Sequence, residues 1–258
     1  MIDRINSNMN KYRTDFSNKS EEMYNKKSRE IKAKKIISVL SHNLNDTSDL
    51  KLLDIGCSTG IMTKQFAIFF KNVVGLDVDE EAIKFAKSNY EDKNLIFINK
   101  SIEDAKIEDN FFDVVVLSHV IQLIPDLENF LSEVSRVIKP GGICYLATGN
   151  RLSLRDPQYN LLFLSLLPKS LGNYYIRLFR DENDYFETNY SLMQLKNFVK
   201  NFEVIDYTLK IISSPNKFSA SDLIKEGSVR HKVLKFFSKT FYFLIPTYIW
   251  VLKKPNYY

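Results

Sequence analysis

The chain has 258 residues, of which 45% are hydrophobic, and its formal net charge is +5. This length suits one large α/β domain with an insertion, and the apolar content is ample for a packed core, which excludes a disordered chain. Lysines are spread along the chain with 31 acidic residues among them, and no dense basic run with interleaved aromatic residues indicates nucleic-acid binding.

Cysteine content and hydropathy indicate the cellular compartment in which the chain is expected to work. Its two cysteines, Cys57 and Cys144, lie in separate sequence contexts and indicate neither a disulfide framework nor a metal site. We therefore expect no metal and a reducing, cytoplasmic location. The first residues are polar and do not resemble a signal peptide. No apolar run approaches the roughly 18 residues that a membrane-spanning helix needs.

The N-terminal part of the chain precedes the first predicted strand. Residues 1–25 are rich in Asn, Lys and Ser, which predicts a loosely ordered segment, although its aromatic residues could fold over a ligand. From residue 26 to residue 40 the apolar side chains recur at helical spacing, with lysines on the opposite face. We therefore expect a helix there.

The rest of the chain is organised around Lys51 to Gly60, which reads Lys-Leu-Leu-Asp-Ile-Gly-Cys-Ser-Thr-Gly. The apolar start predicts a strand, and Gly56 and Gly60 flank three small residues before a helical pattern begins. Glycine adopts positive φ at no steric cost and lets a ligand lie directly on the backbone. The N-terminus of the following helix suits a carboxylate or phosphate. Strand 72–76 then ends on Asp77, a position from which an acid can bind ribose hydroxyls.

Strands and helices continue to alternate after Asp77. This alternation implies right-handed crossovers and a parallel sheet. Asp79 is predicted to cap one helix, and Ser191-Leu-Met-Gln194 forms a capping box for another. The further strands are predicted over residues 95–98, 112–118, 143–148, 202–209 and 247–253.

Five segments in this order resemble the motifs of class I S-adenosylmethionine-dependent methyltransferases, especially the small-molecule group typified by quinone-biosynthesis enzymes. They are Asp54-Ile-Gly-Cys-Ser-Thr-Gly60, Gly75-Leu-Asp77, Phe112-Asp-Val-Val-Val, the segment from Ser118-His119 to Pro125-Asp126, and Val137-Ile-Lys-Pro-Gly-Gly142. The resemblance covers about residues 50–150. It implies a Rossmann-like, seven-stranded, mostly parallel sheet with helices on both faces, in which the last strand inserts antiparallel between the fifth and sixth.

The resemblance also implies S-adenosylmethionine as the cofactor and assigns residues to it. Asp77 would accept hydrogen bonds from the ribose hydroxyls, and Val78 would pack on the adenine. Ser101 stands where an acid usually contacts the adenine amine, and Ser58 stands where glycine is usual. The residues implied to bind the cofactor are Asp54, Gly56, Cys57, Ser58, Gly60, Asp77, Val78, Ser101, Ile102 and Ser118. The alternatives are that Asp54 is a buried strand acid bonded to the loop and that Asp77 is a helix N-cap.

His119 follows the fourth strand, where acceptor chemistry would occur. A neutral imidazole there could take the proton of an acceptor hydroxyl, or it could simply pack. Residues 149–190 change character and predict a lid beside the carboxyl edge of the sheet. Arg155, Asp156 and Tyr159 in this lid are candidates for holding a polar acceptor, or they form surface ion pairs. Residues 150–159 also resemble a subgroup that modifies cell-envelope glycans or lipids.

Residues 191–258 complete the single predicted domain with its sixth and seventh strands. Within them, residues 231–246 are aromatic, basic and amphipathic. This pattern fits a helix packed on the sheet edge, or an interfacial segment that contacts a membrane or a lipid-linked substrate. We therefore expect a cytoplasmic protein that could be peripheral at the membrane.

The sequence predicts methyl transfer from S-adenosylmethionine to a small-molecule, glycan or lipid-linked acceptor, with oxygen as the methylated atom. A nicotinamide-dependent oxidoreductase is disfavoured by the spacing Gly56-x-x-x-Gly60 and by the position of Asp54. A nucleoside-binding module without turnover is an alternative that Ser101 favours slightly. A nucleic-acid methyltransferase would need a base-amine motif after the fourth strand, and Ser118-His119-Val120-Ile121 is not one.

Overall fold

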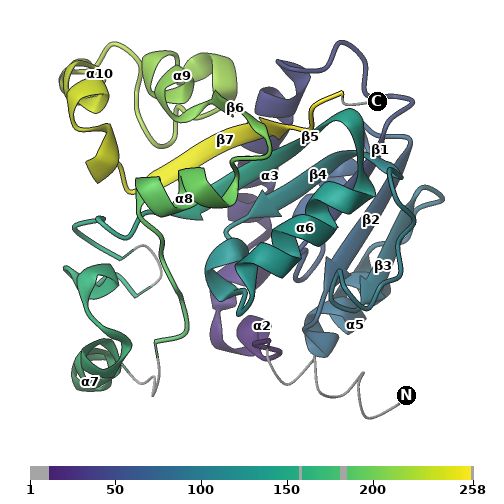
Figure 1. The fold of residues 1–258 in the computed structure, drawn as a ribbon, viewed down its shortest axis with the longest axis horizontal. Coiled ribbons are helices and arrows are strands. Elements are labelled where there is room, and N and C mark those ends of the chain that lie inside the picture. The colour runs from purple at the N-terminus through teal and green to yellow at the C-terminus, as the bar shows by residue number, and fades with distance from the viewer. Residues whose placement is uncertain (1–11, 157–158, 181–184, 257–258) are drawn as a thin grey trace.

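The structure is a computed structural model that describes residues 12–156, 159–180 and 185–256 (Figure 1). A seven-stranded sheet with the order β3-β2-β1-β4-β5-β7-β6 forms its centre. Neighbouring strands run parallel except β7, which is antiparallel to both β5 and β6. The insertion of the last strand is therefore confirmed. The strands are β1 (Lys51–Ile55), β2 (Asn72–Asp77), β3 (Leu95–Asn99), β4 (Phe112–Ser118), β5 (Ile138–Gly149), β6 (Glu203–Asp206) and β7 (Thr247–Lys253).

Helices cover both faces of this sheet. On one face, α6 and α8 pack over Val115 and Leu117 of β4. On the other, α3, α4 and α5 pack over Val114 and Val116 of the same strand. Successive side chains of a strand point to opposite faces, so an apolar run such as β4 is buried on both. The α-helices are α2 (Phe16–Lys19), α3 (Lys26–Ser41), α4 (Ile61–Phe66), α5 (Glu80–Asn89), α6 (Leu127–Val137), α7 (Lys169–Phe179), α8 (Leu192–Phe198), α9 (Thr208–Ser213) and α10 (Val229–Thr240).

Short 3₁₀ turns connect several of these elements. They are η1 (Glu21–Tyr24), η2 (Ile121–Leu123), η3 (Leu164–Leu166), η4 (Asn216–Phe218) and η5 (Tyr242–Leu244). No helix within the described part of the chain is both long and apolar enough to cross a membrane.

Two strands differ in length from their predictions. β5 begins at Ile138 rather than at residue 143, because Ile138 pairs with Phe112 and a register shift then absorbs the Pro-Gly-Gly sequence. β6 ends at Asp206 rather than at residue 209. The Asp206 carboxylate accepts a hydrogen bond of 2.7 Å from the Thr208 N–H, and this turn starts α9 in place of further strand.

Residues 12–25 form α2 and η1 instead of the loosely ordered segment that we expected. The Ser17 N–H donates to Asp79 over 2.8 Å, and the Thr59 hydroxyl donates to the Met23 carbonyl over 2.6 Å. These bonds tie the segment to two loops at the carboxyl ends of β1 and β2. Residues 1–11 of the same prediction lie outside the described residues.

The lid, residues 149–190, lies beside the sheet at the lower left of Figure 1 and carries α7. It has a small apolar cluster of its own, made of Tyr159, Leu161, Leu164, Ile176 and Tyr185. Its two ends pair with each other at an isolated bridge between Asn150 and Tyr190. The lid is thus a distinct packing unit at the end of β5.

Candidate cofactor and acceptor site

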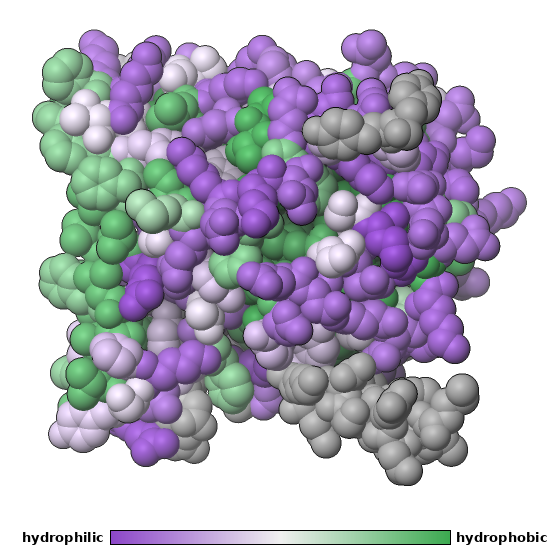
Figure 2. Space-filling model, viewed as in Figure 1, coloured by the Kyte–Doolittle hydropathy of each residue, from purple (hydrophilic) through white to green (hydrophobic). Residues whose placement is uncertain are grey.

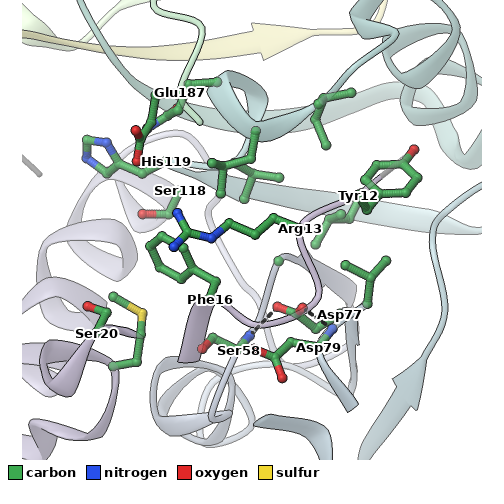
Figure 3. A pocket seen from close by; sticks show the side chains of 18 of the residues that line it. Tyr12, Arg13, Phe16, Ser20, Ser58, Asp77, Asp79, Ser118, His119 and Glu187 are labelled. Atoms are coloured by element: carbon green, nitrogen blue, oxygen red, sulfur yellow. Dashed lines mark hydrogen bonds between the residues drawn. The ribbon is translucent and has the colours of Figure 1, made fainter. Parts of the chain in front are cut away.

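A cavity of about 450 Å³ opens at the carboxyl ends of β1, β2 and β4 (Figure 3). β2 and β4 lie on opposite sides of β1. Because the chain connections leave β1 and β4 in opposite directions, a crevice forms between them, which is where sheets of this kind bind ligands. The N-terminal segment and the lid also line the cavity, so it is bounded by parts of the chain that are far apart in sequence.

The glycine-rich loop after β1 supplies one wall. Gly56 has a φ of +73° and Gly60 one of +74°. A Cβ on Gly56 would lie 2.5 Å from Val120 Cγ2, so the loop can approach the β4 end only with glycine there. Ser58, where glycine is usual in the resembled family, also has a left-handed φ of +50°. Its N–H donates to Asp77 over 2.7 Å, which holds this strained backbone in place.

Asp77 lines the cavity at the tip of β2. One carboxylate oxygen accepts from the Ser58 N–H and the other from the Asp79 N–H over 2.9 Å (Figure 3). The N-cap of α5 is Asp79, whose side chain accepts from the Ala82 N–H over 3.1 Å. The alternative in which Asp77 caps that helix is therefore wrong. Burial raises the pKa of Asp77 to about 6, although the two backbone hydrogen bonds oppose this shift.

Asp54 is a buried strand acid rather than a cavity-lining one. Its side chain is 1% exposed and accepts a hydrogen bond of 2.7 Å from the Thr63 hydroxyl of α4. Burial raises its pKa to about 7, and the nearby positive charge of Arg29 opposes this shift with a smaller effect. Cys57 and Gly60 do not line the cavity either. These three residues therefore fix the loop from behind.

Two cations that the sequence analysis did not single out line the cavity from α3. Arg29 is 7% exposed, and its Nε has no hydrogen-bond partner among the described residues. Lys32 is one helical turn further along the same face. Burial lowers the pKa of each side chain. The only sequence signal was their i, i+3 spacing, which does not distinguish a ligand site from a solvated helix face.

Part of the cavity is lined by apolar side chains, which suit a flat apolar group. Val78, Ile102 and Leu76 line it. Ser101 is also there, and its hydroxyl donates to Asp104 over 3.1 Å. Ser101 and Ile102 thus line the same cavity as Asp77, and the contact with an adenine that the resemblance implies for them stays a prediction.

Ser118 and His119 line the cavity at the end of β4. His119 has a φ of +60°, and its N–H donates to the Ala147 carbonyl over 2.8 Å. The imidazole is accessible from the cavity, yet the surrounding protein and the charges of Lys32 and Arg29 lower its pKa to about 4. His119 is therefore neutral at pH 7.

Of the three lid residues predicted to hold an acceptor, only Asp156 lines the cavity. It is 1% exposed and accepts from Ser165 over 2.8 Å and from the Tyr185 hydroxyl over 3.2 Å. Arg155 is exposed and donates to Asn160 over 3.0 Å. Tyr159 is buried in the lid's own apolar cluster.

Sequence reasoning missed several lining residues, above all Glu187. This lid residue is 5% exposed, and its Oε2 has no hydrogen-bond partner within the described structure. It stands alone in a stretch without helical or strand periodicity, so no local signal marked it. Arg13 and Phe16 from the N-terminal segment also line the cavity (Figure 3).

Comparison with known proteins shows to which family the chain with this cavity belongs. The family described as "Methyltransferase domain" matches residues 53–146. The ubiquinone biosynthesis O-methyltransferase of Rickettsia prowazekii is 28% identical in sequence, and the alignment covers 69% of this chain and 73% of the Rickettsia enzyme. The human mitochondrial enzyme of the same name is 34% identical over 41% of this chain and 30% of its own. The chain is a class I S-adenosylmethionine-dependent methyltransferase.

A structural relative supports the same assignment of fold. The plantazolicin methyltransferase BpumL, solved in complex with S-adenosylhomocysteine, superposes with a TM-score of 0.58 at 18% identity. The superposition covers 97% of this chain and 90% of BpumL. This structural likeness confirms the predicted fold. The family match and the named relatives confirm the predicted enzyme class and cofactor of this methyltransferase, which transfers a methyl group to a small-molecule acceptor.

The residues around the cavity fit S-adenosylmethionine. Arg29 and Ser58 each line the cavity and carry a buried side-chain atom without a partner in the described structure, as expected where a polar ligand completes the hydrogen bonding. When bound, the cofactor supplies an activated methyl group on a sulfonium. The methyltransferase's own residues must hold that group and the acceptor in line, and proximity alone can lower the barrier by ~7–11 kcal/mol.

Proposed function

We propose that this methyltransferase methylates a hydroxyl oxygen on the polar head of an amphiphilic small molecule at a membrane surface. The proposal is carried by the two sides of the lid. Its inner side brings Asp156, Glu187 and Asn189 to the cavity, and its outer side exposes large apolar residues. The relatives named as O-methyltransferases support oxygen as the methylated atom.

For the cofactor, we assign the ribose hydroxyls to Asp77 and the methionine carboxylate to Arg29. The backbone of Gly56 and Ser58 would face the methionine part, and Ser118 would lie beside the sulfonium. Val78 and Ile102 would enclose the adenine, with Ser101 at its edge. Asp54, Cys57 and Gly60 would act indirectly, by fixing the loop.

For the acceptor, we assign contact with the hydroxyl head to His119 and Asp156. A neutral imidazole can orient a hydroxyl through a hydrogen bond without adding charge. Arg155 and Tyr159 lie outside the cavity and would shape the lid around the acceptor.

The membrane contact would be made first by α10 and η5. Val229, Val233, Phe236 and Phe237 share one face of α10 and are 48–79% exposed. Beside them lie four exposed cations, Arg230, Lys232, Lys235 and Lys239, and the helix has no acid. The other side of α10 packs on α9, where His231 Nε2 contacts the Ile212 carbonyl over 2.8 Å. A basic helix with exposed aromatic residues suits a bilayer with anionic headgroups.

The outer side of the lid would extend this contact. Leu171, Tyr174 and Leu178 share a face of α7 and are 54–65% exposed. Figure 2 shows apolar residues gathered along the side of the molecule where Figure 1 places α10 and the lid. An acceptor's apolar tail could stay in the bilayer there while its head enters the cavity beneath the lid.

Hexylcatechol, which joins a hydroxylated head to an apolar tail, is a direct probe. We expect transfer of a methyl group from S-adenosylmethionine to one of its oxygens, and faster transfer when the protein is bound to vesicles of phosphatidylglycerol. Absence of O-methylated product in the presence of vesicles would contradict the proposal.

The membrane contact is tested by sedimentation with the same vesicles. Phe236→Ser/Phe237→Ser should reduce sedimentation, whereas Ile68→Ser, 66% exposed outside this face, should not. Equal sedimentation of both variants, or a wild-type dimer that buries α10, would show that this face does not serve a membrane.

A further inference from the structure

We infer that Glu187 is the general base of the methyl transfer, taking the proton directly from the acceptor hydroxyl. This inference rests on the proposed transfer to oxygen and adds a catalytic residue to it. Glu187 lies outside the sequence motifs and outside the residues that the family match covers.

The segment that carries Glu187 is held firmly against the end of the sheet. The Thr188 N–H donates to the Gln122 carbonyl over 2.7 Å, in the turn just after His119. The Arg151 N–H donates to the Tyr190 carbonyl over 3.1 Å. Glu187 is thereby set beside the ends of β4 and β5. Figure 3 shows its carboxyl group and His119 on the side of the cavity away from Asp77.

The carboxyl group of Glu187 faces the cavity with an unused oxygen. The side chain is 5% exposed and lines the cavity, and Oε2 has no hydrogen-bond partner in the described part of the chain. A buried carboxylate oxygen without a donor is costly unless a ligand supplies one. An acceptor hydroxyl is a donor of the required kind.

The charges that face Glu187 favour a base of intermediate strength. Burial raises its pKa to about 7, and the negative charge of Asp156 acts in the same direction. Arg13 and the Tyr159 hydroxyl lower the pKa without cancelling the effect of burial. A base with a pKa near the working pH is both available and strong enough to receive a proton.

His119 is less suited to this step. Its pKa is lowered to about 4, so its imidazole is neutral but only weakly basic. The neutral ring remains a good hydrogen-bond partner for the acceptor oxygen. The general-base role that the sequence analysis considered for His119 therefore passes to Glu187, and His119 orients the acceptor.

The step balances without a further reactant. The acceptor O–H bond breaks, and its proton goes to Glu187 Oε2. An electron pair of the acceptor oxygen forms the new O–CH₃ bond. The S–CH₃ bond breaks with its electron pair returning to sulfur, which leaves neutral S-adenosylhomocysteine. Glu187 then loses its proton to solvent when the products leave.

The test compares Glu187→Gln with Glu103→Gln on the full chain, using hexylcatechol as acceptor. Glu103 is a matched control, because it also has an Oε2 without a partner in the described structure but does not line the cavity. We expect kcat to fall at least ~100-fold in Glu187→Gln. S-adenosylhomocysteine affinity should be unchanged by calorimetry, and Glu103→Gln should retain wild-type kcat.

The pH dependence separates a base from a structural residue. Wild-type kcat should rise with pH and level off above about 7, Glu187→Asp should keep this dependence at a lower rate, and Glu187→Gln should lose it. An unchanged kcat or an unchanged pH profile in Glu187→Gln would overturn the inference.

A titration of the carboxyl carbon by NMR keeps the inference falsifiable without turnover. It should show one glutamate with a pKa of about 7 that is missing in Glu187→Gln. An ordinary glutamate pKa for this residue would overturn the inference even if hexylcatechol were not methylated. Lack of hexylcatechol methylation by the wild type, in contrast, would count against the proposed acceptor.

Discussion

Replacing Gly56 with alanine tests whether the glycine-rich loop is packed against the end of β4 as closely as the structure indicates. Two costs are expected. The left-handed φ of +73° costs a residue with a Cβ about 1–2 kcal/mol. The new methyl group would lie 2.5 Å from Val120 Cγ2, and overpacking of this kind costs about 1–3 kcal/mol more.

Gly227→Ala is the matched control. Gly227 has a φ of +79°, and nothing lies within 4 Å of a Cβ built on it, so this variant has only the backbone cost. In urea unfolding, Gly56→Ala should lose about 1–3 kcal/mol more free energy of unfolding than Gly227→Ala. Removing the opposing methyl groups in Gly56→Ala/Val120→Ala should recover part of that difference as a favourable coupling.

The same substitution reports on the site. Val120 directly follows His119, and both line the cavity, so displacing Val120 should also weaken S-adenosylhomocysteine binding. The reasoning would be refuted if Gly56→Ala were no less stable than Gly227→Ala, or if the double variant showed no coupling. Either result would mean that the loop does not meet the end of β4 at this distance.

Two further predictions concern the acids near the cofactor. Asp77→Asn should weaken S-adenosylhomocysteine binding by about 1.5–3 kcal/mol in calorimetry with the fold retained, because hydrogen bonds to a charged group are lost, and unchanged affinity would remove the ribose assignment. The raised pKa of Asp54, about 7, means that the folded chain holds a proton that the unfolded chain releases near pH 4. The free energy of unfolding of the wild type, relative to that of Asp54→Asn, should therefore fall by about 1.4 kcal/mol per pH unit as the pH rises between these two pKa values. Urea unfolding at several pH values measures this difference. A difference that does not change with pH would contradict the burial of Asp54.

The sequence alone determined most of the fold and led to several of the residues that line the cavity. Its strands and helices have local causes: apolar runs, the Gly56 to Gly60 loop, the Asp79 cap and the Ser191 to Gln194 capping box. Each of these signals involves residues that are close in the sequence, and the structure has the strands and helices that they predict. The family motifs then led to Asp77, Val78 and Ile102, because each follows a strand end at a fixed spacing.

Only the tertiary structure decided which polar side chains face the cavity. Arg29 is on a helix, Glu187 is in an irregular lid segment, and residues 12–25 close over the loops through bonds to Asp79 and Thr59. Conversely, Asp54 and Tyr159 turned away from the cavity. Burial and pairing of a polar group depend on segments distant in sequence, and local periodicity carries no information about them. The physical reason is that a cavity is formed by the packing of several elements against one another, whereas each strand or helix is formed by residues that are neighbours in the sequence.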